Sequence, residues 1–84
     1  MEIVSCIPGR VRIILDDLYG NMSLAPALCK ELYSNKNVYS VKINTYTAKL
    51  LIVYDKDTIS YEDLLSCIDA CLRSLFESSK IDSN

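Results

Sequence analysis

Histidine is absent from this 84-residue chain, and glycine and proline occur only twice each. Without histidine the chain lacks the side chain that most often serves as a general base, so a cysteine nucleophile would have no evident partner. Two glycines are too few for a phosphate-cradling loop, and no G-x-S-x-G motif is present. These absences favour a protein that is not an enzyme and predict no cofactor.

A strong charge of either sign and a long apolar run are also missing. The formal net charge is −2, whereas nucleic-acid-binding domains usually have a large basic excess. No segment approaches the roughly 20 apolar residues that span a bilayer, and the first residues lack the basic start of a signal peptide. We therefore expect a cytoplasmic protein with no nucleic-acid partner and no membrane span, which would reach any membrane compartment through a partner.

Half of the residues are hydrophobic, which is enough for a folded core. A chain of this length holds one domain, and its core must be thin. We expect that domain to span residues 1–77 and the polar residues 78–84 to form a C-terminal tail.

Strand-like and helical patterns follow one another along the chain. Alternation predicts strands at 9–15, 38–44 and 49–55. Apolar residues at helical spacing predict one helix that begins near Asn21 or Ser23 and a second that begins after Ser60. The resulting βαββα order predicts an α+β fold, in which an antiparallel sheet carries both helices on one face and the first and third strands are neighbours.

The residues before the first predicted strand leave one question open. Pro8 and Gly9 read as a turn or bend, because proline cannot continue a strand ladder and glycine tolerates unusual dihedral angles. Residues 3–7 precede that bend and either extend the strand or form a further strand at the edge of the sheet.

Several segments in this order resemble a known family. They are I-P-G-R-V-R-I at 7–13, V-Y-S-V-K-I-N at 38–44, L-L-I-V-Y-D at 50–55 and Y-E-D-L-L at 61–65. Together they look like the divergent branch of the heavy-metal-associated (HMA) domains, which carries a P-G-R-x-R signature in place of the metal-binding cysteine loop. The resemblance implies a ferredoxin-like fold.

The same resemblance implies a link to metal homeostasis. The metal that it implies is iron, because related small proteins accompany iron-storage granules called ferrosomes. Domains of this branch also accompany metal-transporting P-type ATPases, which implies a protein partner of that kind. A ferrosome-associated motif resembles R-(H/N)-x-x-x-G-R-x-R. Gly9, Arg10 and Arg12 match it, whereas Val4 and Ser5 stand at its first two positions.

Four cysteines are present, at Cys6, Cys29, Cys67 and Cys71, and none of them forms a C-x-x-C pair. The segment 16–22, where an HMA domain presents M-x-C-x-x-C, contains none. Cys67 and Cys71 share a helix face and could supply two ligands, with Cys6 as a third, but a closed zinc site needs four. We interpret the cysteines as core residues and keep a thiol-based metal site as the alternative.

The sheet face turned away from the helices is the predicted binding surface. By alternation it carries Arg10, Arg12, Ile14, Lys42, Asn44, Leu51 and Val53. We expect Ile14, Leu51 and Val53 to form an apolar patch rimmed by cations, close to Pro8 and Gly9. Clustered apolar residues mark interfaces, and arginine suits an acidic partner or a phosphate, although solvated charges would explain the arginines equally simply.

The sequence thus favours an interaction protein that binds a protein partner and also forms a homo-oligomer through this face. Two other functions stay open. One is the thiol-based metal site already described. The other is a small regulatory domain that binds a ligand at a dimer interface.

Overall fold

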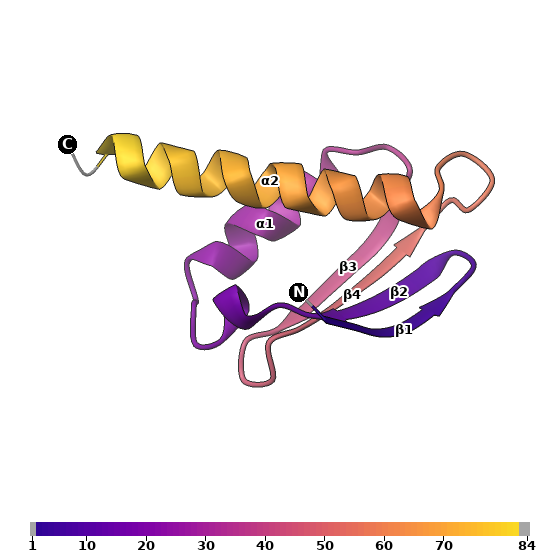
Figure 1. The fold of residues 1–84 in the computed structure, drawn as a ribbon, viewed down its shortest axis with the longest axis horizontal. Helices are drawn as coiled ribbons and strands as arrows, with labels where there is room; N and C mark the ends of the chain where they lie inside the picture. Colours follow the sequence, from indigo (N-terminus) through magenta and orange to yellow (C-terminus); the bar gives the residue numbers. More distant parts are fainter. Residues whose placement is uncertain (1, 83–84) are drawn as a thin grey trace.

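The computed structural model describes the backbone of residues 2–82 and the side chains of residues 2–75. The elements in order are β1 (Glu2–Ile7), β2 (Arg10–Ile14), the 3-10 turn η1 (Asp16–Leu18), α1 (Leu24–Tyr33), β3 (Val38–Asn44), β4 (Lys49–Tyr54) and α2 (Tyr61–Asp82). The four strands form one open antiparallel sheet, and both helices lie on the same side of it (Figure 1). The α+β, ferredoxin-like class predicted from the sequence is confirmed.

The strand β1 is separate from β2, which answers the question left open by the sequence. The turn between them consists of Pro8 and Gly9, and Gly9 has a φ of +84°, a conformation that favours glycine. The strands lie in the order β1-β2-β4-β3. β1 therefore fills the sheet edge that the expected βαββα order left empty, and the observed order is ββαββα.

The strands β2 and β4 are neighbours at the centre of the sheet. They correspond to the first and third strands of the sequence prediction, so the predicted adjacency is confirmed. Val11 lies opposite Ile52 and Ile13 opposite Leu50, and all four side chains are fully buried. The helices cover them with their own buried residues, Leu24, Leu28 and Leu32 from α1 and Leu64, Ile68 and Leu72 from α2. One face of the sheet is thus committed to the core, which fixes the other face as the outer one.

Both helices begin where capping chemistry predicts. The Asn21 side-chain oxygen accepts a hydrogen bond from the Leu24 backbone N–H at 2.9 Å, and Ser60 Oγ accepts one from the Asp63 backbone N–H at 3.1 Å. At its other end α2 continues to Asp82, so the segment 78–84 expected as a tail begins within that helix. Residues 83–84 lie outside the described residues.

The turn at Gly9 gives a first prediction. A Cβ at this position would lie 3.4 Å from the Tyr54 carbonyl oxygen, at a φ that β-carbon-bearing residues rarely adopt. We expect Gly9→Ala to lower the free energy of unfolding by about 1–2 kcal/mol, measured by urea denaturation. Gly9→Asn should cost less, because asparagine tolerates positive φ better than alanine. Equal stability of Gly9→Ala and the parent would contradict this role.

Candidate interaction surface

The sheet face turned away from the helices, called here the open face, consists of three rows of side chains that cross all four strands. Directly opposed residues of an antiparallel pair lie on the same face, so the strand register fixes these rows. From β1 to β3 they are Ile7, Arg10, Val53 and Ser40; then Ser5, Arg12, Leu51 and Lys42; then Glu2, Ile14, Lys49 and Asn44. Every residue that the sequence placed on this face lies there, with Pro8 and Gly9 in the turn at one end.

Sequence reasoning missed some members of this surface. Lys49 alternates with Leu51 and Val53 along β4, so the strand pattern alone could have included it. Ile7 and Glu2 could not be assigned, because their place depends on β1 pairing with β2.

Cations gather on the open face. Arg10, Arg12, Lys42 and Lys49 lie on it against the single carboxylate of Glu2, although the whole chain has a net charge of −2. Many acidic residues lie on other elements instead: Asp16, Asp17, Glu31, Asp55, Asp57, Glu62, Asp63 and Asp69. Within the described side chains, the one ion pair joins Arg73 and Asp69 on α2 at 3.2 Å, so the four open-face cations have no carboxylate partner there.

Three apolar residues of the open face lie among these cations. Ile14, Leu51 and Val53 are only half-buried, and Leu51 lies between Arg12 and Lys42 in its row. Long cationic side chains characteristically lay their aliphatic stems over apolar neighbours while the charge stays in water. The surface is therefore an apolar floor beneath cationic groups, and is less openly apolar than the sequence suggested.

A shallow hollow marks one end of the open face. It has a volume of about 360 Å³ and is lined by Pro8, Gly9, Tyr39, Val53, Tyr54, Asp55, Lys56 and Asp57. Hydrogen bonds from the Thr58 hydroxyl at 2.6 Å and from the Asp57 backbone N–H at 3.0 Å lower the pKa of the Asp55 carboxyl. Partial desolvation, followed by the nearby Asp55 charge, raises the pKa of Tyr39. This end carries negative charge, so the cationic surface stops here.

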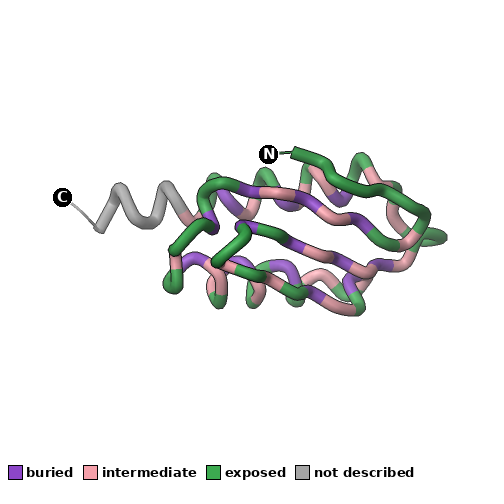
Figure 2. Tube along the Cα trace, turned by 90° about the horizontal axis from the view of Figure 1, so that it is seen from below, coloured by how far each residue is buried: buried purple, intermediate pink, exposed green. Residues whose placement is uncertain are grey.

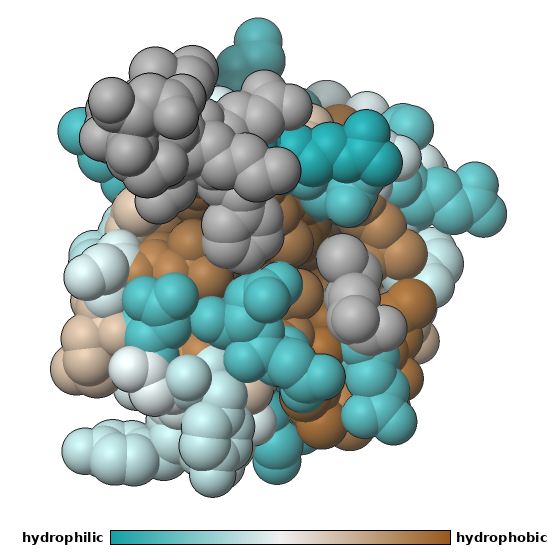
Figure 3. Space-filling view, turned by 60° about the vertical axis from the view of Figure 1, so that its left-hand side comes forward, coloured by the Kyte–Doolittle hydropathy of each residue, from teal (hydrophilic) through white to brown (hydrophobic). Residues whose placement is uncertain are grey.

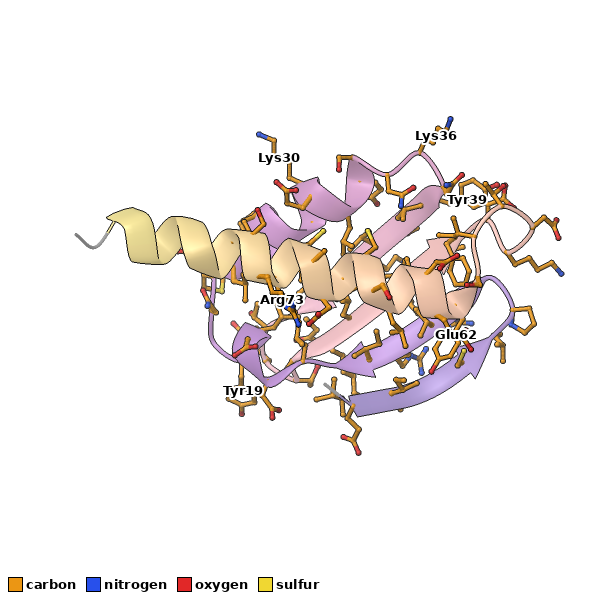
Figure 4. All side chains as sticks on the ribbon, turned by 45° about the horizontal axis from the view of Figure 1, so that its top comes forward. Tyr19, Lys30, Lys36, Tyr39, Glu62 and Arg73 are labelled. Carbon is orange, nitrogen blue, oxygen red and sulfur yellow. The ribbon has the colours of Figure 1, made fainter. Side chains whose placement is uncertain are left out.

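The segment 16–22 after β2 is tied into the body of the domain. Leu18 of η1 is fully buried, the Gly20 backbone N–H donates to the Thr45 carbonyl at 2.9 Å, and Asn21 caps α1. Tyr19, labelled in Figure 4, stays exposed beside η1. Two thiolates on a mobile loop are what passes a soft ion between proteins, and this segment has no thiol.

The cysteines lie on three elements of the fold, Cys6 on β1, Cys29 on α1, and Cys67 and Cys71 on α2. Cys67 and Cys71 lie one turn apart on α2, where the Asn35 side-chain nitrogen is 3.9 Å from Cys67 Sγ. Burial, together with the adjacent Cys67 thiol, raises the pKa of Cys71 to about 11. Cys6 is exposed on β1, at a second hollow lined also by Tyr61 at the start of α2. Within residues 2–75, no group of three His, Cys, Asp or Glu side chains could hold a metal ion, so the three thiols do not form one site.

The fold and surface define a ferredoxin-like α+β domain with an open cationic sheet face and no thiol loop. The chain belongs to the heavy metal associated domain 2 family, whose model matches residues 1–83. Membership indicates a metal-related role, since such domains are metal-binding and interaction modules that often bind partner proteins. Neither the curated proteins nor the solved structures include a match. Among the described residues, no helix combines the length and apolar character needed to cross a membrane.

The raised pKa of Cys71 gives a second prediction. At pH 8 a thiol of pKa about 11 is ionised on the order of one part in a thousand, and only the thiolate alkylates rapidly. We expect iodoacetamide to label the exposed Cys6 first and Cys71 far more slowly, with the Cys71 rate still rising as the pH passes 9. Peptide mass spectrometry at a series of pH values measures both rates. The difference should vanish in urea, and equal labelling of the two in the folded protein at pH 8 would refute it.

Proposed function

We propose that this chain is a non-enzymatic docking module of a metal-handling system, with iron as the metal, and that it binds an acidic surface of a protein partner through the open face. One observation carries the proposal. Among the side chains of residues 2–75, Arg10, Arg12, Lys42 and Lys49 have no carboxylate partner and lie beside half-buried apolar residues, whereas Glu2 is the single acidic residue on their face.

The chemistry of the open face suits a carboxylate-rich protein. Arg10 and Arg12 are two positions apart on β2, so both lie on the open face. There each guanidinium group can donate two hydrogen bonds to a carboxylate. Half-buried Leu51 and Val53 lie on the neighbouring strand and supply apolar contact area once the cations are neutralised. Complementary charge of this kind chiefly sets specificity and speeds association.

The same charges disfavour a homo-oligomer formed face to face. A two-fold contact brings the same patch of both copies together, so it would place four cations against four like charges. An acidic partner removes that repulsion. We therefore assign the open face to a different protein and not to self-association.

The partner's identity is proposed from the resemblance to the P-G-R-x-R branch, here Pro8, Gly9, Arg10 and Arg12. That branch accompanies metal-transporting P-type ATPases and iron-storage compartments. A cytoplasmic module that docks onto such a pump would act at the membrane through its partner. The segment 16–22 offers no thiol for carrying a soft ion. The function of the module would therefore be to position or regulate the pump.

Charge reversal on the open face tests the proposal. Arg10→Glu combined with Arg12→Glu should weaken binding to a detergent-solubilised metal-transporting P-type ATPase from the same cells by at least about tenfold, because each reversal turns an attraction into a repulsion. Biolayer interferometry at two salt concentrations measures the affinity, which should fall as salt rises.

The matched control is Lys30→Glu combined with Lys36→Glu, which changes the net charge equally. Both lysines are exposed, and Figure 4 shows them extending outward on the helix side, away from the sheet. This variant should bind like the parent. Equal losses in the two double variants would show that total charge rather than the open face governs binding. Undiminished binding of the Arg10 and Arg12 variant would rule out the open face as the docking site.

A further inference from the structure

The edge strand β1 is the most exposed regular element of the domain. All six of its residues are exposed, and Ile3, Val4 and Ile7 retain 41%, 49% and 51% of their accessible surface. Figure 2 shows this strand as a continuous exposed edge beside the alternating burial of β2. Within the part of the chain that the structure describes, no strand pairs with its outer side.

The strand β1 packs mainly against its neighbouring strand. Its extensive contacts are with β2 alone, while α1 packs on β3 and on α2. Figure 3 brings the left-hand side of Figure 1 forward and shows apolar surface between hydrophilic side chains there. Both the backbone and the apolar side chains of β1 are therefore available to another strand.

The strand lacks most of the features that protect an edge from pairing. Natural edge strands use lysine, internal proline or inward charge to prevent it. Within β1, Glu2 at one end is the only charged residue and there is no proline. The opposite edge, β3, carries Lys42 on its open face and the exposed Tyr39. β1 does contain one protective feature, a bulge between Ile3 and Ser5. This bulge also changes which faces of the sheet the side chains of β1 occupy.

The bulge gives β1 a mirror-like order of side chains. Ile3 and Cys6 lie opposite the buried Ile13 and Val11, so they face the helix side. Glu2 and Ile7 lie on the open face. An unbroken strand would put residues 2 and 7 on opposite faces, and the extra residue between Ile3 and Ser5 restores them to the same face. The faces occupied by Glu2 and Ile3 at one end of β1 are therefore the same as those occupied by Ile7 and Cys6 at the other end.

From this match we infer that a second copy of this chain pairs with β1, antiparallel and about a two-fold axis between Val4 and Ser5. Ile3 then lies opposite Cys6 of the other copy, and Glu2 opposite its Ile7. Each pair joins residues of the same face, as antiparallel pairing requires.

Charge supports the second copy as the occupant. In this register Glu2, the one carboxylate of the open face, enters the row that continues through Ile7 to Arg10 of the other copy. The contact thus adds an acid to a row that contains a cation two strands away, whereas face-to-face stacking would oppose cations. The inference does not depend on the proposed partner, because pairing at the edge leaves the open face uncovered.

A disulfide trap tests the register. Opposed residues of an antiparallel pair have Cα atoms about 4.5–5.5 Å apart, which a disulfide can bridge. Ile3→Cys should therefore form a covalent dimer through Cys6 of the other copy when diamide accepts the two electrons and two protons released. Non-reducing electrophoresis detects it. The parent should not form the dimer, since its two Cys6 residues lie about 10 Å apart along the paired strands.

Two outcomes of the trap are decisive. Adding Cys6→Ser to Ile3→Cys should abolish the covalent dimer. A dimer that persists in this double variant, or none in Ile3→Cys alone, overturns the register.

A charge placed near the axis tests the association itself. Val4→Lys changes an exposed side chain, so the domain should stay folded by circular dichroism, but the two lysines would meet beside the two-fold axis. Sedimentation should show the parent as a dimer and this variant as a monomer. Tyr39→Lys, on the far edge strand, is the matched control and should remain a dimer. A monomeric parent at about 1 mM, or equal dissociation of the two variants, overturns the inference.

Discussion

The pairing of β2 with β4 decides which side chains of this domain meet the helices and which meet a partner. Because the side-chain period of a strand is two, burying Val11, Ile13, Leu50 and Ile52 under the helices forces their neighbours to the other face. A register slip of one residue would exchange the apolar and cationic sets. The same strand pairing therefore fixes the core on one face of the sheet and the interaction surface on the other.

This dependence explains how much of the molecule the sequence predicted. The alternating residues of β2 and β4, and the regularly spaced leucines of the helices, were readable because burial itself imposes the pattern. Even the irregular spacing of Val38 and Val41 on β3 was assigned to the correct face, and a bulge between Val38 and Ser40 accounts for it. The absence of a thiol in the segment 16–22 followed directly from residue types.

What the sequence could not supply depends on pairing between segments. Every residue of β1 is exposed, so no burial pattern marks it as a strand, and only the turn at Pro8 and Gly9 hinted at a hairpin. The apolar patch on the open face was predicted in the right place, but the half-burial of Leu51 depends on where Arg12 and Lys42 lie beside it. Alternation specifies a face but says nothing about how neighbours shield one another on it.

The two proposed surfaces reinforce one another physically. Pairing through β1 would join the two sheets edge to edge and present both open faces on one side, so a partner with two acidic patches would meet two cationic surfaces held at a fixed spacing. The second contact then forms at a high effective concentration, and the combined affinity exceeds that of either face. A domain this small has a thin core and little stability to spare, which an added strand on its exposed edge would increase. The edge strand that the sequence left uncertain is thus the element that would connect folding stability to docking strength.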